Sequence, residues 1–284
     1  MIPGSSKARY KRKTLKMDVF LIPDRADAIR DLLEGLRAWP IWTRLGWQEV
    51  KRRYRRTVLG PFWATLSLGI FIAAISFVWA PLFGTKLDVY LPFFASGMVA
   101  WTLASTLVNE SCTIFASGEG LIKQLNFPFS TLVYMTVWRN LIVFFHHLVI
   151  LALIYLFFPP VSWSALLLLP LGLLIIAIHG VAIGILIGIA CARFRDIAPL
   201  ITNLMQVLLF ITPIFWAADQ LGAKGKFFVE FNYMYHLVSV VREPLRGHVP
   251  TFGSYMTTIL GGAIICLIMF EFYARFRRRI VYWL

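Results

Sequence analysis

Three histidines are the side chains of this sequence best suited to acid–base chemistry. His146 and His147 lie inside one long apolar stretch, and His179 lies inside the next. Ionisable groups at such positions often form proton relays. A relay usually also needs a carboxylate, but Glu110 and Glu271 fall only at the ends of apolar stretches. We therefore expect neutral histidines that hydrogen-bond to neighbouring helices, and we predict no catalytic residues.

Two glycine-containing stretches have a partial likeness to a phosphate-binding loop. The stretch 118–123 has Ile122 where the second glycine of such a loop must lie, and the stretch 222–227 lacks both the spacing and the hydroxyl. We therefore expect no cofactor in this chain, so ATP and Mg²⁺ would be bound by a partner. The three cysteines show no metal-ligand spacing, and we predict no metal site and small buried thiols at Cys112, Cys191 and Cys266.

Two short polar segments could dock onto another protein. The first, 117–128, combines glycines, a short amphipathic turn and a proline stop, so we expect one or two helical turns across the membrane face. The second, 192–197, joins two apolar stretches. Each could equally be a solvated turn. The candidate docking residues are Gly118, Glu119, Leu121, Lys123, Gln124, Asn126, Phe127, Arg193, Phe194, Arg195 and Asp196.

The elements that position these segments follow from composition. Of the 284 residues, 59% are hydrophobic and only 15% are charged, against about a quarter charged in soluble domains. We predict an all-α integral membrane protein. Its six transmembrane helices are expected at 60–83, 91–111, 132–158, 164–190, 198–217 and 255–274.

The cations give the orientation. The net charge is +14, with clusters at 7–16, 51–56 and 275–279, each near an apolar stretch. This flanking pattern favours contact with anionic membrane lipids and argues against nucleic acid. Since cations remain on the cytoplasmic side, both termini are predicted to be cytoplasmic. Arg139 is expected to snorkel to the cytoplasmic headgroups.

Residues 1–59 and 60–284 are predicted to form two regions. The first 16 residues are basic and are not followed by the apolar core of a signal peptide, so we expect a cytoplasmic tail. Residues 24–50 have an amphipathic pattern typical of a helix in the membrane interface, although packing on a soluble partner is also possible. The second region is the six-helix permease domain.

Two further patterns concern packing. Gly180, Gly184 and Gly188 recur every four residues, which lets another helix approach closely, either within the chain or across a dimer seam. The connection 218–254 is unusually aromatic, so we expect short re-entrant or interfacial helices there.

Together these features resemble the ABC-2 type permeases that export polysaccharides, above all the O-antigen exporters of the Wzm kind. The similarity extends over about residues 40–275. One departure is Asn232-Tyr233, where such permeases commonly have Asn-Pro. The motifs that support the resemblance are 55–63 (RRTVLGPFW), 194–197 (FRDI), 212–215 (TPIF), 232–235 (NYMY) and 242–247 (REPLRG).

The resemblance implies a homodimer that works with two copies of a cytoplasmic ABC ATPase subunit in the bacterial inner membrane. Residues 117–128 would be its coupling helix, 193–197 a second ATPase contact, 24–50 its interface helix, and 221–247 a pair of periplasmic gate helices. The substrate would be a glycan linked to undecaprenyl pyrophosphate. Exporters of capsule, of teichoic acid or of lipophilic drugs are alternatives, and an ATP-independent secondary transporter is a further one.

The implied substrate suggests two more sets of residues. Cations at the cytoplasmic face could contact the pyrophosphate, or could act only as topology anchors: Arg52, Arg53, Arg55 and Arg56. Aromatic side chains could line the glycan channel or gate, or could belong to the interfacial aromatic belt: Trp101, Tyr134, Trp216, Phe231, Tyr233 and Tyr235.

Overall fold

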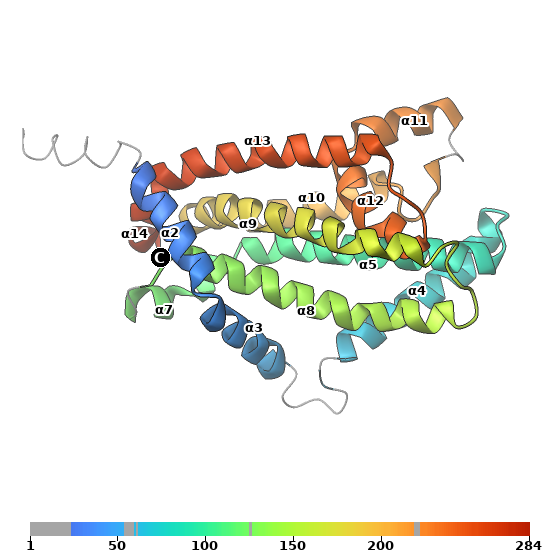
Figure 1. Ribbon diagram of the computed structural model, residues 1–284, viewed down its shortest axis with the longest axis horizontal. Helices are drawn as coiled ribbons and strands as arrows, with labels where there is room; N and C mark the ends of the chain where they lie inside the picture. Colours follow the sequence, from blue (N-terminus) through green and yellow to red (C-terminus); the bar gives the residue numbers. More distant parts are fainter. Residues whose placement is uncertain (1–23, 54–59, 61, 125–126, 219–221) are drawn as a thin grey trace, which may run out of the picture.

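The computed structural model describes residues 24–53, 60, 62–124, 127–218 and 222–284, and every regular element among them is a helix. Long helices run side by side in a bundle (Figure 1). They are α4 (Phe62–Leu82), α5 (Leu87–Ser111), α8 (Ser130–Tyr155), α9 (Leu169–Arg193), which follows the 3₁₀ turn η1 (Ser164–Leu168), and α13 (Phe252–Phe276).

The short elements gather at the two ends of this bundle (Figure 1). One end, called here the cation-rich end, has α2 (Arg25–Arg37), α3 (Trp39–Arg53), α6 (Ile114–Ser117), α7 (Glu119–Gln124), η3 (Arg277–Arg279) and α14 (Ile280–Trp283). The opposite end has α11 (Gly222–Phe231) and α12 (Tyr233–Arg246). Two short helices therefore occupy the aromatic connection, while their depth and their action as a gate remain predictions.

Within the described residues, five helices are long and apolar enough to cross a bilayer. The sixth expected span is α10 (Ile197–Ile211), which has only 15 residues. A spanning helix needs about 20 residues. The all-helical membrane class is confirmed, and a sixth span remains a prediction.

The expected helix over 198–217 is wrong at its C-terminal end, because α10 stops at Ile211. Thr212 is extended, with ψ 135°, and a residue before proline is driven out of the helical region. The irregular stretch that follows is buried at Thr212, Ile214 and Phe215. Its carbonyl groups have partners, as buried backbone requires: Arg242 donates to Pro213 O at 2.7 Å and Tyr90 donates to Phe215 O at 2.7 Å.

The small-residue face of α9 packs against helices of the same chain. A Cβ added at Gly184 would lie 2.8 Å from Val133 on α8, and one at Gly188 would lie 2.9 Å from Phe115 on α6. These distances are shorter than real Cβ contacts, so a larger residue at either position would force the neighbouring side chain to shift. The glycine pattern therefore serves packing within the chain.

Helix α2 buries the face that carries small side chains and exposes the face that carries large apolar side chains. Ala28, Asp31 and Gly35 are buried where α2 meets α8 and α13. The apolar side chains remain about half exposed: Ile29 at 47%, Leu33 at 48% and Leu36 at 53%. An amphipathic helix that exposes its apolar face is suited to lie in a membrane interface.

Candidate functional site

The two predicted docking segments meet at the cation-rich end. Helices α6 and α7 form a ridge between two hollows. One hollow, of about 760 Å³, lies against α3 and includes Lys51, Arg52 and Gly120. The other, of about 380 Å³, lies against the end of α9 and includes Glu119 and Arg195. We call them the α3 hollow and the α9 hollow.

The helix packing explains why segments more than 70 residues apart share one hollow. Gly188 on α9 allows Phe115 on α6 to approach closely, which brings the end of α9 beside the ridge. The turn after α9 then places Arg195 in the same hollow as Glu119. This arrangement could not be deduced from either segment alone.

The ridge has buried anchors and exposed charges. Gly118 is buried against Leu132, where a Cβ would lie 2.3 Å from a methyl group. Leu121 and Phe127 are partly buried hydrophobic side chains packed on the same core cluster. Glu119 and Lys123 form an exposed ion pair within α7, so both are accessible.

Two predicted docking positions, Gln124 and Asn126, lie partly or wholly outside the described residues. The backbone of Gln124 ends α7, but its side chain lies outside the described structure, as does the whole of Asn126.

The turn after α9 presents a row of exposed side chains, from Arg193 to Asp196. Arg193 is not free, because its guanidinium stacks on Phe194 at 5.0 Å and on Trp283 at 5.2 Å. Cation–π contacts of this kind fix α14 against the end of α9. Arg195 and Asp196 are the charged groups best placed to meet a partner.

The cations at the end of α3 have different environments. Arg52 is 76% exposed and makes only a weak pair with Glu49 at 3.4 Å. Arg53 bonds to Glu110 at 3.1 Å and is committed to the bundle. Arg55 and Arg56 lie outside the described residues. The structure therefore leaves Arg52, with Lys51, at the α3 hollow.

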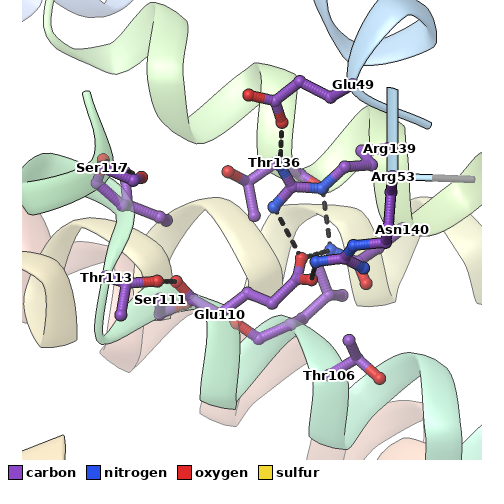
Figure 2. Close-up of polar contacts among 12 residues, drawn as sticks. Glu49, Arg53, Thr106, Glu110, Ser111, Thr113, Ser117, Thr136, Arg139 and Asn140 are labelled. Atoms are coloured by element: carbon purple, nitrogen blue, oxygen red, sulfur yellow. Dashed lines mark hydrogen bonds and ion pairs between the residues drawn. The ribbon is translucent and has the colours of Figure 1, made fainter. Parts of the chain in front are cut away.

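A partly buried ion network joins α3 to α5 and α8 (Figure 2). Arg139 bonds to Glu49 and, at 2.8 Å, to Glu110, which also accepts from Asn140 at 2.7 Å. The two carboxylates and the two guanidinium groups of Arg53 and Arg139 balance in charge. Arg139 and Glu110 are each 16% exposed, so mutual pairing is what makes them tolerable at this depth. The expectation that Arg139 snorkels to headgroups is wrong.

Asp31 is the centre of a second polar network, which the sequence analysis did not predict. Its carboxylate accepts from the backbone N–H groups of Phe129 and Ser130 at 3.0 Å, from the Tyr273 hydroxyl at 2.6 Å and from Arg277 Nε at 2.9 Å. Asp31 thus ties α2 to the start of α8 and the end of α13. The signal was the spacing of Asp31 with Ala28 and Gly35, which marks a second, small-residue face on α2.

The six predicted channel aromatics are not brought together. Trp216 and Tyr235 line one cavity at the opposite end. Tyr233 hydrogen-bonds to His179 on α9, and Phe231 is 75% exposed. Trp101 is 4% exposed and packs inside the bundle.

Tyr134 lies at the cation-rich end, where its hydroxyl donates to Leu32 O at 3.1 Å. The histidines differ from one another: His179 bonds to Tyr233 as expected of a neighbouring helix, while His146 contacts the carbonyl of Ile142 in its own helix. His147 is buried.

Comparison with known proteins agrees with this architecture. An "O-antigen export system permease protein RfbA" of Klebsiella pneumoniae is 21% identical over 239 residues, which cover 82% of this chain and 90% of that protein. A protein of the same name from Myxococcus xanthus is 24% identical over 172 residues, which cover 60% of this chain and 65% of that protein.

One protein family matches most of the helix bundle. The model of the ABC-2 type transporter family matches residues 42–245, from α3 to the end of α12. The match includes the ridge, the α3 hollow and the Glu110 network, and all of the α9 hollow except Trp283 and Leu284. The chain therefore belongs to the ABC-2 type transporter family of membrane proteins.

Proposed function

We propose that this chain is the non-catalytic membrane subunit of an ATP-driven exporter, and that its substrate is a polysaccharide linked to undecaprenyl pyrophosphate. O-antigen is the foremost candidate, because the relatives are O-antigen export permeases. Capsular polysaccharide and teichoic acid have the same general chemistry. The observation that supports the proposal most is that the α6–α7 ridge and the turn after α9, the two docking segments, line one hollow.

In this proposal the ridge is the coupling element. A homodimer forms the channel, and two ATPase subunits bind at the cation-rich ends, on the cytoplasmic side of the inner membrane. The hollows on both sides of the ridge could accommodate protruding side chains of a partner surface. Glu119 and Arg195 have opposite charges and line one hollow, so a complementary pair on the ATPase would fix its orientation.

The cations of α3 have a separate role in the proposal. Lys51 and Arg52 line the α3 hollow, next to the ridge. Guanidinium and ammonium groups bind phosphate oxygens well, so this is where the pyrophosphate of the lipid carrier would first meet the protein. The same cations also anchor the topology.

Reconstitution with the partner ATPase tests the proposal. The purified chain should hydrolyse no ATP alone, and a complex with the ATPase should hydrolyse ATP and export the lipid-linked glycan in vesicles. Glu119→Lys and Arg195→Glu should each weaken assembly or uncouple hydrolysis from export, because they reverse charges in the shared hollow. Glu34→Lys, on an exposed face of α2, is the matched control.

ATP hydrolysis by the chain alone would refute the assignment. Normal assembly and export in both charge-reversal variants would remove the docking role of the ridge.

A lipophilic small molecule is the second candidate substrate. An apolar cavity of about 500 Å³ lies between α4 and α8 and is lined by side chains such as Leu66, Ile70, Val149 and Leu153. Such a cavity could accept a drug-like molecule. Stimulation of the ATPase complex by lipophilic compounds, with none by the lipid-linked glycan, would favour this alternative.

A further inference from the structure

A second cavity lies at the opposite end of the bundle, away from the ridge. It has a volume of about 390 Å³ and is formed by the start of α5, the irregular stretch after α10 and one face of α12. Its volume falls within the range of about 300–1,000 Å³ that is typical of small-molecule sites. The cavity shares no lining residue with the two hollows beside the ridge.

Arg242 is the deepest charged group in this cavity. Its side chain is only 3% exposed. Nη1 donates to Pro213 O at 2.7 Å, and the guanidinium stacks on Phe93 at 4.1 Å. Nε has no hydrogen-bond partner among the described residues. This Nε is itself enclosed by the protein, and its nearest carboxylate oxygen, on Glu243, is 3.9 Å away, so the buried positive charge is only partly compensated.

The charges of the cavity favour an anion. Among the described residues, the charged side chains that line it are Arg242, Glu243 and Arg246. Glu243 lies 3.3 Å from Arg246 and 3.9 Å from Arg242, so one carboxylate is shared by two guanidinium groups. Burial lowers the pKa of Arg242 to about 10, which still leaves it charged at neutral pH. One positive charge remains uncompensated.

The rest of the lining is aromatic. Tyr90, Phe93, Trp216 and Tyr235 surround the charged group. Phe93 is held by both guanidinium groups, with Arg246 at 5.1 Å. Aromatic faces pack against the C–H surfaces of a sugar ring, whereas a bare inorganic ion would gain nothing from them.

We propose that this cavity binds one sugar unit that carries a carboxylate. The carboxylate would accept from Arg246 and would be attracted by the buried charge of Arg242, and the ring would pack on the aromatic lining. The proposal rests on the proposed function, because it identifies acidic sugars as units of the exported glycan that the opposite end of the bundle recognises.

Titration of the full-length protein in lipid nanodiscs tests the site directly, with methyl glucuronide and methyl glucoside as probes and tryptophan fluorescence or calorimetry as the readout. The glucuronide should bind about tenfold more tightly or better, as expected for a charge-assisted hydrogen bond. Arg246→Gln should remove this preference. Glu243→Gln should strengthen glucuronide binding, because it removes the competing carboxylate.

The matched control is Lys86→Gln, which removes a cation from the same end of the bundle that is not among the residues lining the cavity. It should leave the preference unchanged. Arg242 is left intact because it also supports the backbone at Pro213.

Equal binding of the two sugars, or no binding of either, would overturn the proposal. So would an unchanged preference in Arg246→Gln, or weaker glucuronide binding in Glu243→Gln. Displacement of the glucuronide by inorganic phosphate at equal concentration would show that the cavity recognises negative charge alone, and would also overturn the proposal. The test needs no ATPase, so a negative result with normal coupled export would reject this site without rejecting the proposed function.

Discussion

Asp31 is the single residue on which three distant parts of the chain converge. Its carboxylate is fully buried, and Arg277 is its charged partner. Removing one member of a buried ion pair leaves the other without compensation, which costs more than the pair itself contributes. Residues 127–130 follow the ridge in the chain and lead into α8, and Asp31 accepts from the N–H groups of Phe129 and Ser130. Asp31 therefore also holds the segment that supports the C-terminal side of the proposed coupling element.

Asp31→Asn should lower the free energy of unfolding by about 3 kcal/mol, because it keeps the size of the side chain but leaves Arg277 with only the more distant carboxylate of Asp27, at 3.9 Å. Thermal unfolding in detergent, compared with the wild type, measures this. Glu34→Gln on the exposed side of the same helix is the control and should change stability by less than about 0.5 kcal/mol. Equal effects of the two substitutions would show that the Asp31 network does not stabilise the fold.

Single residues also show where sequence reasoning ends. The charge of Arg139 was visible, and snorkelling was a sound expectation for a lone arginine near a helix end. Its partners are Glu110, 29 residues away, and Glu49, 90 residues away. Asp31 contacts Tyr273 and Arg277, more than 240 residues further along the chain. Nothing local in the sequence encodes such pairings.

At the scale of elements, α12 is held by very close packing on α9. A Cβ added at Gly172 would lie 2.2 Å from the carbonyl oxygen of Val240, which belongs to the backbone of α12 and cannot rotate away. The glycine thus sets the distance between a spanning helix and the helix that carries Arg242.

Gly172→Ala should force α12 outward and destabilise the protein by about 1–3 kcal/mol, the usual cost of overpacking. Gly253→Ala is the matched control, since a Cβ there meets nothing within 4 Å and alanine is the better helix former. Thermal unfolding of both variants gives the comparison. If Gly172→Ala proves as stable as Gly253→Ala, the close approach of the two helices is wrong.

Most elements could be predicted because their signals are local. Hydropathy located five long helices to within a few residues, and the amphipathic pattern located α2 and α3. The end of α10 was missed because apolar residues continue past Pro213, and a hydropathy window does not register the break. The two docking segments were identified from their glycine, proline and charge content, but their shared hollow depends on packing between α6 and α9.

At the scale of the whole molecule, connections alternate between the two ends. The turn around Val161 lies at the end with α12, since its N–H donates to Arg246 O. The turn at Phe194 lies at the cation-rich end, next to α14. In a bilayer, these two turns should therefore face opposite compartments.

Cysteine labelling checks this arrangement. In a variant without Cys112, Cys191 and Cys266, a cysteine at Val161, which is 75% exposed, should react with a membrane-impermeant maleimide in intact spheroplasts. A cysteine at Phe194, which is 50% exposed, should react only after lysis. The cysteine-free protein is the blank. One spanning helix, α9, separates the two turns. Labelling of both positions from the same side would therefore contradict a single crossing of the membrane by α9.

The short length of α10 has a consequence for the lipid around the protein. A helix of 15 residues is about 22 Å long, whereas the hydrocarbon core of a bilayer is about 30 Å thick. Its outer stripe of Leu200, Leu204, Val207 and Phe210 is exposed on the subunit. If α10 crosses the membrane as predicted, hydrophobic mismatch would draw the two leaflets together wherever acyl chains rather than protein meet this stripe, and the membrane would be thinnest beside the break at Pro213.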